Sequence, residues 1–141
     1  METAKVLIID DEVEFSTTLA ERLVLRDYEA LAATSLKHVL SLIEEVRPNV
    51  VLLDLKMPGI DGLELLRDIK KIDPGIQVIV ITGRTDPGIL NDVLGAGAYD
   101  CLTKPADISQ LMEKIEEITA ASKDRPEESE EPKSEERRRS S

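Results

Sequence analysis

Residues 49–59 read Asn-Val-Val-Leu-Leu-Asp-Leu-Lys-Met-Pro-Gly, and this stretch decides the fold. Its apolar, partly β-branched half predicts a short strand that is buried on both faces, as in a parallel sheet. Pro58 and Gly59 end the strand and predict a loop. Asp54 is therefore expected at the carboxyl end of a buried strand, which is where open α/β sheets bind their ligands.

On both sides of this stretch, strand patterns alternate with helical ones. Five strands are predicted, over Lys5–Ile9, Tyr28–Ala32, Val50–Asp54, Ile76–Thr82 and Tyr99–Thr103, the second of them near a sheet edge. Apolar residues at helical spacing predict helices over Val13–Arg26, from about Leu36 to a stop at Pro48, from an N-cap at Asp61 to Ile72, from Asp86-Pro87 to Leu94, and around Ile108–Ile118. Right-handed crossovers between such units give an α/β fold with a five-stranded, doubly wound parallel sheet.

The composition limits the classes of function. The 141 residues are enough for one domain, whose core must be aliphatic because the chain has no Trp, one Phe and two Tyr. A net charge of −11 disfavours nucleic acid and anionic membranes as direct partners. One Cys excludes an internal disulfide, and the sequence shows neither a signal-peptide pattern nor an apolar run of membrane-spanning length. We therefore expect a soluble cytoplasmic protein.

The character of the sequence changes near residue 121. Residues 122–141 carry six basic and seven acidic groups and no apolar stretch that could be buried. We expect a folded domain over residues 1–121 and a disordered polar tail or linker over residues 122–141. We expect either a single-domain protein or the N-terminal piece of a longer one, in which residues 122–141 begin a linker.

Polar side chains of particular kinds follow four of the predicted strands. They are Asp10 and Asp11 after the first strand, Asp54 after the third, Thr82 after the fourth and Lys104 after the fifth. Because the carboxyl ends of parallel strands share one edge, these groups are expected in one crevice. Clustered carboxylates repel each other, and a hard divalent cation with oxygen ligands relieves the repulsion. Together with a hydroxyl and an ammonium group, they suit phosphoryl transfer to a carboxylate.

Four segments resemble the receiver domain of bacterial two-component response regulators. They are Ile8-Ile9-Asp10-Asp11-Glu12, Leu53 to Gly62, Val80-Ile81-Thr82-Gly83 and Leu102-Thr103-Lys104-Pro105, and the resemblance covers about residues 4–121. It implies a flavodoxin-like fold with strand order 2-1-3-4-5. It also implies a signalling switch and not a metabolic enzyme. The chemistry of such a switch is limited to the Mg²⁺-dependent acceptance and loss of its own phosphoryl group. The implied partners are a sensor histidine kinase or phosphotransfer protein, a downstream protein target, and a second copy on phosphorylation.

The same resemblance implies a role for each residue of the crevice. Asp54 accepts a phosphoryl group from a phosphohistidine, and Thr82 and Lys104 contact the phosphoryl oxygens. The implied Mg²⁺ site consists of Asp10 acting through water, Asp11, Asp54 and the backbone carbonyl of Lys56. The bond between Lys104 and Pro105 is expected to be cis, which an X-Pro bond permits at modest cost.

One position departs from the family pattern. The family usually has Tyr or Phe three residues before the motif Lys, where this chain has Cys101, and Tyr99 lies two residues earlier. Strand alternation places Tyr99 and Cys101 on the same face at different depths, so Tyr99 is not expected to replace the missing aromatic. Output is expected instead from Thr82, the loop after it and the glycine-containing helix at 86–94, which we expect to shift on phosphorylation.

Three other functions can be weighed against this one. An aspartyl-phosphate phosphatase needs a second acid two residues after its nucleophile, where this chain has Lys56. A flavodoxin-like cofactor binder needs hydroxyls and amides after the first strand, where Asp10-Asp11-Glu12 would repel a phosphate. A module that keeps the fold but binds proteins without phosphorylation is the alternative favoured by Cys101. Capping of the first helix by Asp10 or Asp11 also stays open, and it is compatible with metal binding.

Overall fold

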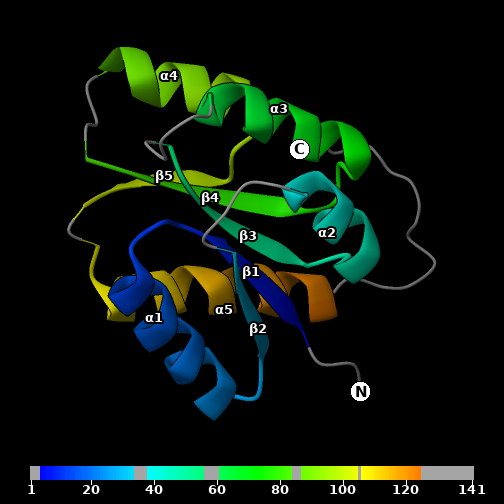
Figure 1. Ribbon diagram of the computed structural model, residues 1–141, viewed down its shortest axis with the longest axis vertical. Coiled ribbons are helices and arrows are strands. Elements are labelled where there is room, and N and C mark those ends of the chain that lie inside the picture. Colours follow the sequence, from blue (N-terminus) through cyan, green and yellow to red (C-terminus); the bar gives the residue numbers. More distant parts are fainter. Residues whose placement is uncertain (1–3, 34–37, 56–60, 84–86, 105, 125–141) are drawn as a thin grey trace.

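The fold is described from a computed structural model, which covers residues 4–33, 38–55, 61–83, 87–104 and 106–124 (Figure 1). Strands and helices alternate throughout this part of the chain, and each strand lies within one residue of its predicted bounds. The strands are β1 (Lys5–Ile9), β2 (Glu29–Ala33), β3 (Val50–Asp54), β4 (Gln77–Thr82) and β5 (Asp100–Thr103). The helices are α1 (Val13–Leu25), α2 (Val39–Val46), α3 (Gly62–Ile72), α4 (Pro87–Gly95) and α5 (Ile108–Asp124).

The strands form one parallel sheet with the order β2-β1-β3-β4-β5. Figure 1 shows α1 and α5 on one face of this sheet and α2, α3 and α4 on the other. The predicted α/β class, the doubly wound sheet and the strand order 2-1-3-4-5 are therefore confirmed. The prediction that the second strand lies at an edge is also confirmed, because β2 pairs only with β1.

The register of the strands brings their carboxyl ends together. All five residues of β3 are buried, which agrees with its continuous apolar sequence. Ile9 pairs with Leu53 and Asp54 pairs with Ile81, so β1, β3 and β4 end at the same level of the sheet. One aliphatic cluster packs between the sheet and α2, α3 and α4, and a second packs between the sheet and α1 and α5. The sheet edge that carries the polar groups is thus held on a rigid core.

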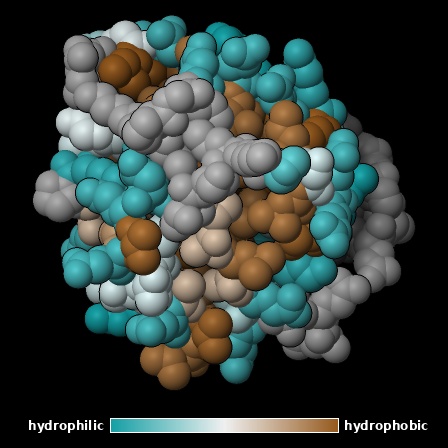
Figure 2. Space-filling view, viewed as in Figure 1, coloured by the Kyte–Doolittle hydropathy of each residue, from teal (hydrophilic) through white to brown (hydrophobic). Residues whose placement is uncertain are grey.

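The surface is of mixed character. On the face seen in Figure 2, hydrophobic residues lie among hydrophilic ones. Leu31 of β2 and Leu40 of α2 are among the large hydrophobic residues that stay exposed, which agrees with β2 being an edge strand. None of the helices within the described ranges is long and apolar enough to cross a membrane.

The ends of two helices bear on the capping predictions. Asp61 is the N-cap of α3, and its Oδ1 accepts hydrogen bonds from the backbone N–H groups of Leu63 and Glu64 at 3.1 and 3.2 Å. The N-cap of α1 is Glu12, which makes no capping bond through its side chain. Neither Asp10 nor Asp11 therefore caps α1, and both carboxylates are left for the crevice.

The remaining helix ends lie near residues that the structure does not describe. Helix α4 begins at Pro87, as expected for a proline in the first turn, whereas its predicted cap, Asp86, lies outside the described residues. Helix α5 continues to Asp124, three residues beyond the domain boundary expected from sequence. Residues 125–141 lie outside the described part, so the polar tail stays a prediction.

Gly62, the first residue of α3, has no room for a side chain. A Cβ atom there would lie 2.8 Å from the Cα, Cδ2 and O atoms of Leu55, the residue after β3. We expect Gly62→Ala to lower the free energy of unfolding by about 1–3 kcal/mol, as overpacking does elsewhere. Urea unfolding measures this change. Gly95→Ala is the matched control, since nothing lies within 4 Å of its Cβ position, and it should not destabilise the protein. Equal stability of the two variants would contradict the prediction.

Candidate functional site

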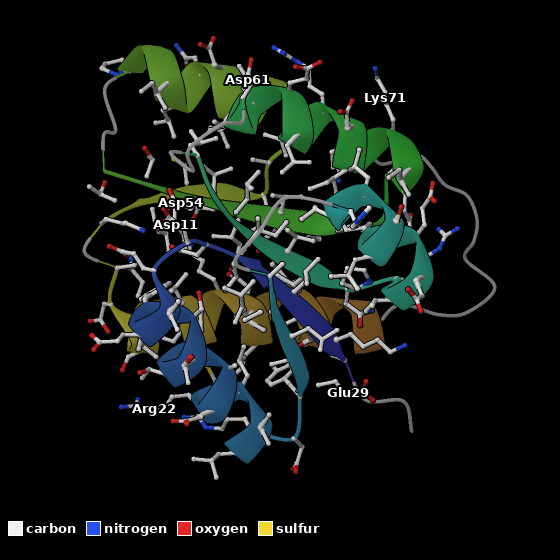
Figure 3. All side chains as sticks on the ribbon, viewed as in Figure 1. Asp11, Arg22, Glu29, Asp54, Asp61 and Lys71 are labelled. Atoms are coloured by element: carbon white, nitrogen blue, oxygen red, sulfur yellow. The ribbon has the colours of Figure 1, made fainter. Side chains whose placement is uncertain are left out.

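The predicted polar groups meet at the carboxyl edge of the sheet. Asp10 follows β1, Asp54 and Thr82 are the last residues of β3 and β4, and Lys104 follows β5. Figure 3 shows Asp11 and Asp54 next to each other at this edge. Asp10, Asp54 and Thr82 are buried, whereas Asp11 is exposed. The crevice thus has buried acids at its base and an exposed acid at its mouth.

Three carboxylates in this crevice are close enough to share a cation. One oxygen each of Asp10, Asp11 and Asp54 lies within 4.8 Å of the other two. Oδ1 of Asp10 accepts a hydrogen bond from the backbone N–H of Glu12 at 2.8 Å, whereas the buried Oδ2 receives no hydrogen bond from the described residues and has only the ion-pair contact to Nζ of Lys104 at 3.2 Å. A buried carboxylate oxygen of this kind is unusual in folded proteins. Oxygen ligands with this charge fit a hard divalent cation such as Mg²⁺.

Lys104 places its ammonium group among the acids. Its Nζ lies 3.0 Å from Oδ2 of Asp54, 3.2 Å from Oδ2 of Asp10 and 2.8 Å from Oε1 of Glu12. Burial by itself lowers the pKa of Lys104, but the hydrogen bonds to Glu12, Asp54 and Asp10 outweigh it and raise the pKa above its usual range. Lys104 is therefore charged at every physiological pH and partly compensates the acidic cluster.

Backbone bonds fix the strand ends that carry these groups. The N–H of Lys104 donates to the carbonyl of Thr82 at 2.8 Å, which ties the end of β5 to the end of β4. The N–H of Leu55 donates to the carbonyl of Ile81 at 3.2 Å and does the same for β3 and β4. The backbone carbonyl of Lys56 and the Lys104–Pro105 bond, both named by the sequence predictions, involve residues outside the described part.

The protein family of this chain follows from a comparison with known families. The chain matches the model of the response regulator receiver domain over residues 6–116. It belongs to this family. Receiver domains are modules of two-component response regulators, in which aspartate phosphorylation and Mg²⁺ binding at an acidic pocket are general features. The resemblance noted in the sequence is thereby confirmed.

Individual relatives agree with this assignment. Sporulation initiation phosphotransferase F of Bacillus subtilis (strain 168) is 32% identical over 115 residues, which are 82% of this receiver chain and 93% of that protein. The CheY-like receiver domain protein of Methanospirillum hungatei JF-1 superposes with a TM-score of 0.80 at 30% identity, over 88% of this chain and 100% of its own. A response regulator of Burkholderia pseudomallei with a phosphorylated aspartic acid and a calcium ion has a TM-score of 0.73 at 25% identity, over 84% of this chain and 72% of its own.

Sequence reasoning missed one member of the receiver's polar crevice. Glu12 makes the shortest of the three carboxylate contacts to Lys104, but it entered the prediction only as part of the run Asp10-Asp11-Glu12. Its place directly after two predicted site residues was the available signal. What the sequence could not give is the pairing, because the two residues are separated by 92 positions.

The position of the missing aromatic is filled by a packed thiol. Cys101 lies against the aliphatic cluster on the α2, α3 and α4 side of the sheet. Burial, and then the neighbouring Asp100 carboxylate, raise the pKa of the Cys101 thiol, so it is not an activated thiolate. Tyr99 precedes β5, and its hydroxyl donates to Oε1 of Glu117 on α5 at 2.8 Å. Strand alternation therefore does not apply to Tyr99, and its ring does not take the place of an aromatic at Cys101.

Proposed function

We propose that Asp54 is the phosphoacceptor of this receiver and that Thr82 and Lys104 bind the phosphoryl group. The observation that carries the proposal is the surroundings of Asp54, a carboxylate at the end of a buried strand with an ammonium 3.0 Å away and two further carboxylates beside it. Such a cluster suits acceptance of an anionic group only when positive charge is supplied. Lys104 supplies one such charge and a divalent cation supplies the rest.

We assign the cation site to Asp10, Asp11, Asp54 and the backbone carbonyl of Lys56. The closeness of the three carboxylates supports this assignment, as does the buried Oδ2 of Asp10, which receives no hydrogen bond from the described residues and has only the ion-pair contact to Lys104. When bound, Mg²⁺ offsets the negative charge of the carboxylates and of the phosphoryl oxygens. Asp11 is exposed and is the ligand that a cation arriving from solvent meets first.

The transfer itself is a displacement at phosphorus. An oxygen of the Asp54 carboxylate attacks the phosphorus of a phosphohistidine, so that an O–P bond forms. The N–P bond breaks, and its electron pair goes to the imidazole nitrogen of the donor. Lys104 and the hydroxyl of Thr82 donate hydrogen bonds to the phosphoryl oxygens. The phosphoryl group is lost in a second displacement, in which a water oxygen attacks the phosphorus and the bond between phosphorus and the Asp54 oxygen breaks. The electron pair of that bond returns to the carboxylate, inorganic phosphate leaves, and a proton of the water passes to solvent.

This chemistry makes the protein a switch and not an enzyme that acts on other molecules. Its donor is a sensor histidine kinase or a phosphotransfer protein, and its output is a protein target in the cytoplasm. The phosphorylated aspartic acid of the Burkholderia pseudomallei relative supports an acyl phosphate as the signalling form. A net charge of −11 argues against nucleic acid as a direct target. The proposal includes a homodimer of the phosphorylated form, which the resemblance to the receiver family implies.

The intact mass of the protein after incubation with acetyl phosphate tests the proposal. Wild-type protein with Mg²⁺ should gain one phosphoryl group, and removal of Mg²⁺ with a chelator should prevent the gain. A folded wild-type protein that gains no mass would favour the alternative, a receiver-like module that binds partners without phosphorylation. Restoring an aromatic with Cys101→Tyr would then be the next variant.

Mg²⁺ should stabilise the fold, and acid should weaken this effect. Burial raises the pKa of Asp10, and the Glu12 amide and Lys104 offset only part of the rise. A raised pKa means that the folded state favours protonated Asp10, so this group stabilises the apoprotein at low pH and loses that contribution as pH rises through its folded pKa. Mg²⁺ needs the ionised form and competes with the proton. At 100 times its Kd, it should add about 2.7 kcal/mol at pH 7 and less at pH 5.

Thermal unfolding with and without Mg²⁺ at the two pH values measures this effect. Asp11→Ala is the variant that should lose the Mg²⁺ response without removing a buried charge, because Asp11 is exposed. A Mg²⁺ response of equal size at pH 5 and pH 7 would contradict the role given to Asp10.

Helix α4 is the element that we expect to respond to phosphorylation. Val93 is its only fully buried residue among those described, and a solvent-open cavity of about 260 Å³ lies between α4 and the start of α3. Leu55, which follows Asp54 in the chain, lines this cavity with Ile89 and Val93 of α4. Few buried contacts and a solvent-open cavity beside the helix permit a second arrangement of α4, which the phosphoryl group would favour.

Amide hydrogen exchange on binding of a phosphoryl mimic measures the response. Exchange in α4 should change more than in α1, which packs directly against β1 and β2. Unchanged exchange in α4 would rule out this output route.

A further inference from the structure

The ammonium group of Lys104 has as many acidic partners as it has protons. A protonated amine donates three hydrogen bonds. In this structure its neighbours are the carboxylates of Asp10, Asp54 and Glu12. The contact to Glu12 is the shortest of the three, at 2.8 Å. All three donors are therefore engaged before any phosphoryl group arrives.

Two of these three contacts must change during the proposed reaction. Asp54 becomes esterified when it accepts the phosphoryl group, and Asp10 belongs to the acid cluster that fits a divalent cation. Glu12 is neither the acceptor nor a member of the three-carboxylate cluster. Its contact to Lys104 is the one that can persist through the whole cycle.

The backbone of Glu12 is held firmly although its side chain is exposed. Its N–H donates to Oδ1 of Asp10 at 2.8 Å, and its carbonyl accepts the N–H of Ser16 at 3.0 Å as the N-cap of α1. The root of the side chain is therefore fixed to β1 and to α1. The fixed backbone keeps the Glu12 carboxylate within reach of Lys104, so only the side-chain rotamers of Glu12 must be ordered to form the pair.

The first turn of α1 contributes a second contact to Lys104. The Nζ atom lies 5.8 Å from the centroid of the Phe15 ring, within the range of a cation–π interaction. Phe15 in turn packs against the core cluster on the α1 and α5 side. Together, Glu12 and Phe15 approach the ammonium from α1, whereas Asp10 and Asp54 approach it from the strand ends.

We propose that Glu12 is a positioning residue. It holds the Lys104 ammonium in the crevice while Lys104 exchanges its contacts to Asp10 and Asp54 for contacts to the phosphoryl group. The proposal rests on the function proposed above, in which Lys104 binds the phosphoryl group. An ordinary surface ion pair would contribute little. The pair formed here differs because only the Glu12 side chain is exposed, at 60%, whereas the Lys104 side chain is 19% exposed and its ammonium also contacts two buried carboxylates. Pre-orienting a charged donor toward the reacting group accelerates phosphoryl transfer.

The rate at which phosphorylated protein loses its phosphoryl group is the best measurement. The attacking water is neutral, so this rate does not report repulsion between Glu12 and an anionic donor. Glu12→Ala should slow the loss about 3- to 10-fold, the scale of one charge-assisted hydrogen bond. Glu12→Gln, which keeps an oxygen acceptor without the charge, should slow it by less. The rate of phosphorylation by phosphoramidate should also fall, and it should fall more in Glu12→Ala than in Glu12→Gln.

Two comparisons separate positioning from a general effect of charge or stability. Glu14→Ala removes an equal charge from an exposed residue of the same helical turn and should leave both rates unchanged. In a Lys104→Met background, Glu12→Ala should have no further effect, because Glu12 acts only through Lys104. Urea unfolding of each variant checks that the fold is retained.

The outcomes are distinct. Slower loss in Glu12→Ala that disappears in the Lys104→Met background supports the proposal. Wild-type rates in Glu12→Ala, an equal slowing in both backgrounds, or faster phosphorylation with unchanged loss would each overturn it. A wild-type protein that takes up no phosphoryl group, or an Asp54→Ala protein that still does, would overturn the proposed function itself, and this inference with it.

Discussion

The Asp54→Ala variant should gain no phosphoryl mass when it is incubated with Mg²⁺ and acetyl phosphate, under conditions in which the wild-type protein gains one phosphoryl group. The reason is that no other acid of the described part combines the features of this site. Asp54 ends the central buried strand, lies 3.0 Å from the Lys104 ammonium and has an oxygen within 4.8 Å of those of Asp10 and Asp11. Loss of the nucleophile removes the acyl phosphate altogether. Intact mass spectrometry resolves the two states directly.

The variant must also be shown to be folded and otherwise unchanged. Removing a buried carboxylate from an acidic cluster relieves repulsion, so Asp54→Ala should unfold at the same or higher urea concentration than wild type. Asp92→Ala, which removes an exposed acid from α4, is the matched control and should be phosphorylated normally. A phosphoryl adduct on Asp54→Ala that is lost on treatment with hydroxylamine would place the acyl phosphate on another carboxylate.

The elements that sequence patterns predict well are those with a local physical cause. The run Val50–Leu53 must be a buried strand because it is apolar throughout, and Asp61 caps α3 because its short carboxylate reaches the first free N–H groups. The position of the crevice followed from topology, since parallel strands put their carboxyl ends on one edge. These causes act within a few residues or through a general rule of sheet geometry.

The features that sequence patterns did not give depend on contacts between distant residues. The pairing of Glu12 with Lys104 depends on how α1 sits against the end of β5, which no local pattern encodes. The strand β5 begins at Asp100 and not at Tyr99, although the Tyr99 N–H still donates to the carbonyl of Val78 in β4, and the Tyr99 hydroxyl bonds to Glu117 of α5. Helix α2 begins only at Val39, after His38 in a left-handed conformation with φ 70°. Such details are set by tertiary packing that overrides local preference.

Lys104→Met should have the second largest effect, and it should appear in two independent measurements. The rate of phosphorylation by acetyl phosphate should fall about 100-fold, as expected when one preorganised donor to a developing negative charge is removed. Met keeps most of the apolar stem of the side chain and loses only the ammonium. The loss is therefore assigned to charge and hydrogen bonding and not to a cavity.

The second measurement is stability without Mg²⁺. Removing the ammonium leaves the buried Asp10 and Asp54 carboxylates facing each other, which should lower the free energy of unfolding by about 3 kcal/mol, the low end for a broken buried ion pair. Uptake of a proton by Asp10 limits the cost, because burial already raises the pKa of this group. The destabilisation of Lys104→Met should therefore shrink as pH falls toward 5.

Mg²⁺ should stabilise Lys104→Met more than it stabilises the wild-type protein. In the wild type, the cation must share the carboxylates with an ammonium 3.2 Å from Asp10 and 3.0 Å from Asp54, whereas in the variant it meets them without a competing positive charge. Lys71→Met, which removes an exposed charge from α3, controls for net charge and should change neither rate nor Mg²⁺ response. A Mg²⁺ response equal to that of wild type would mean that the cation and Lys104 do not share the same acids, and the proposed metal site would have to lie elsewhere.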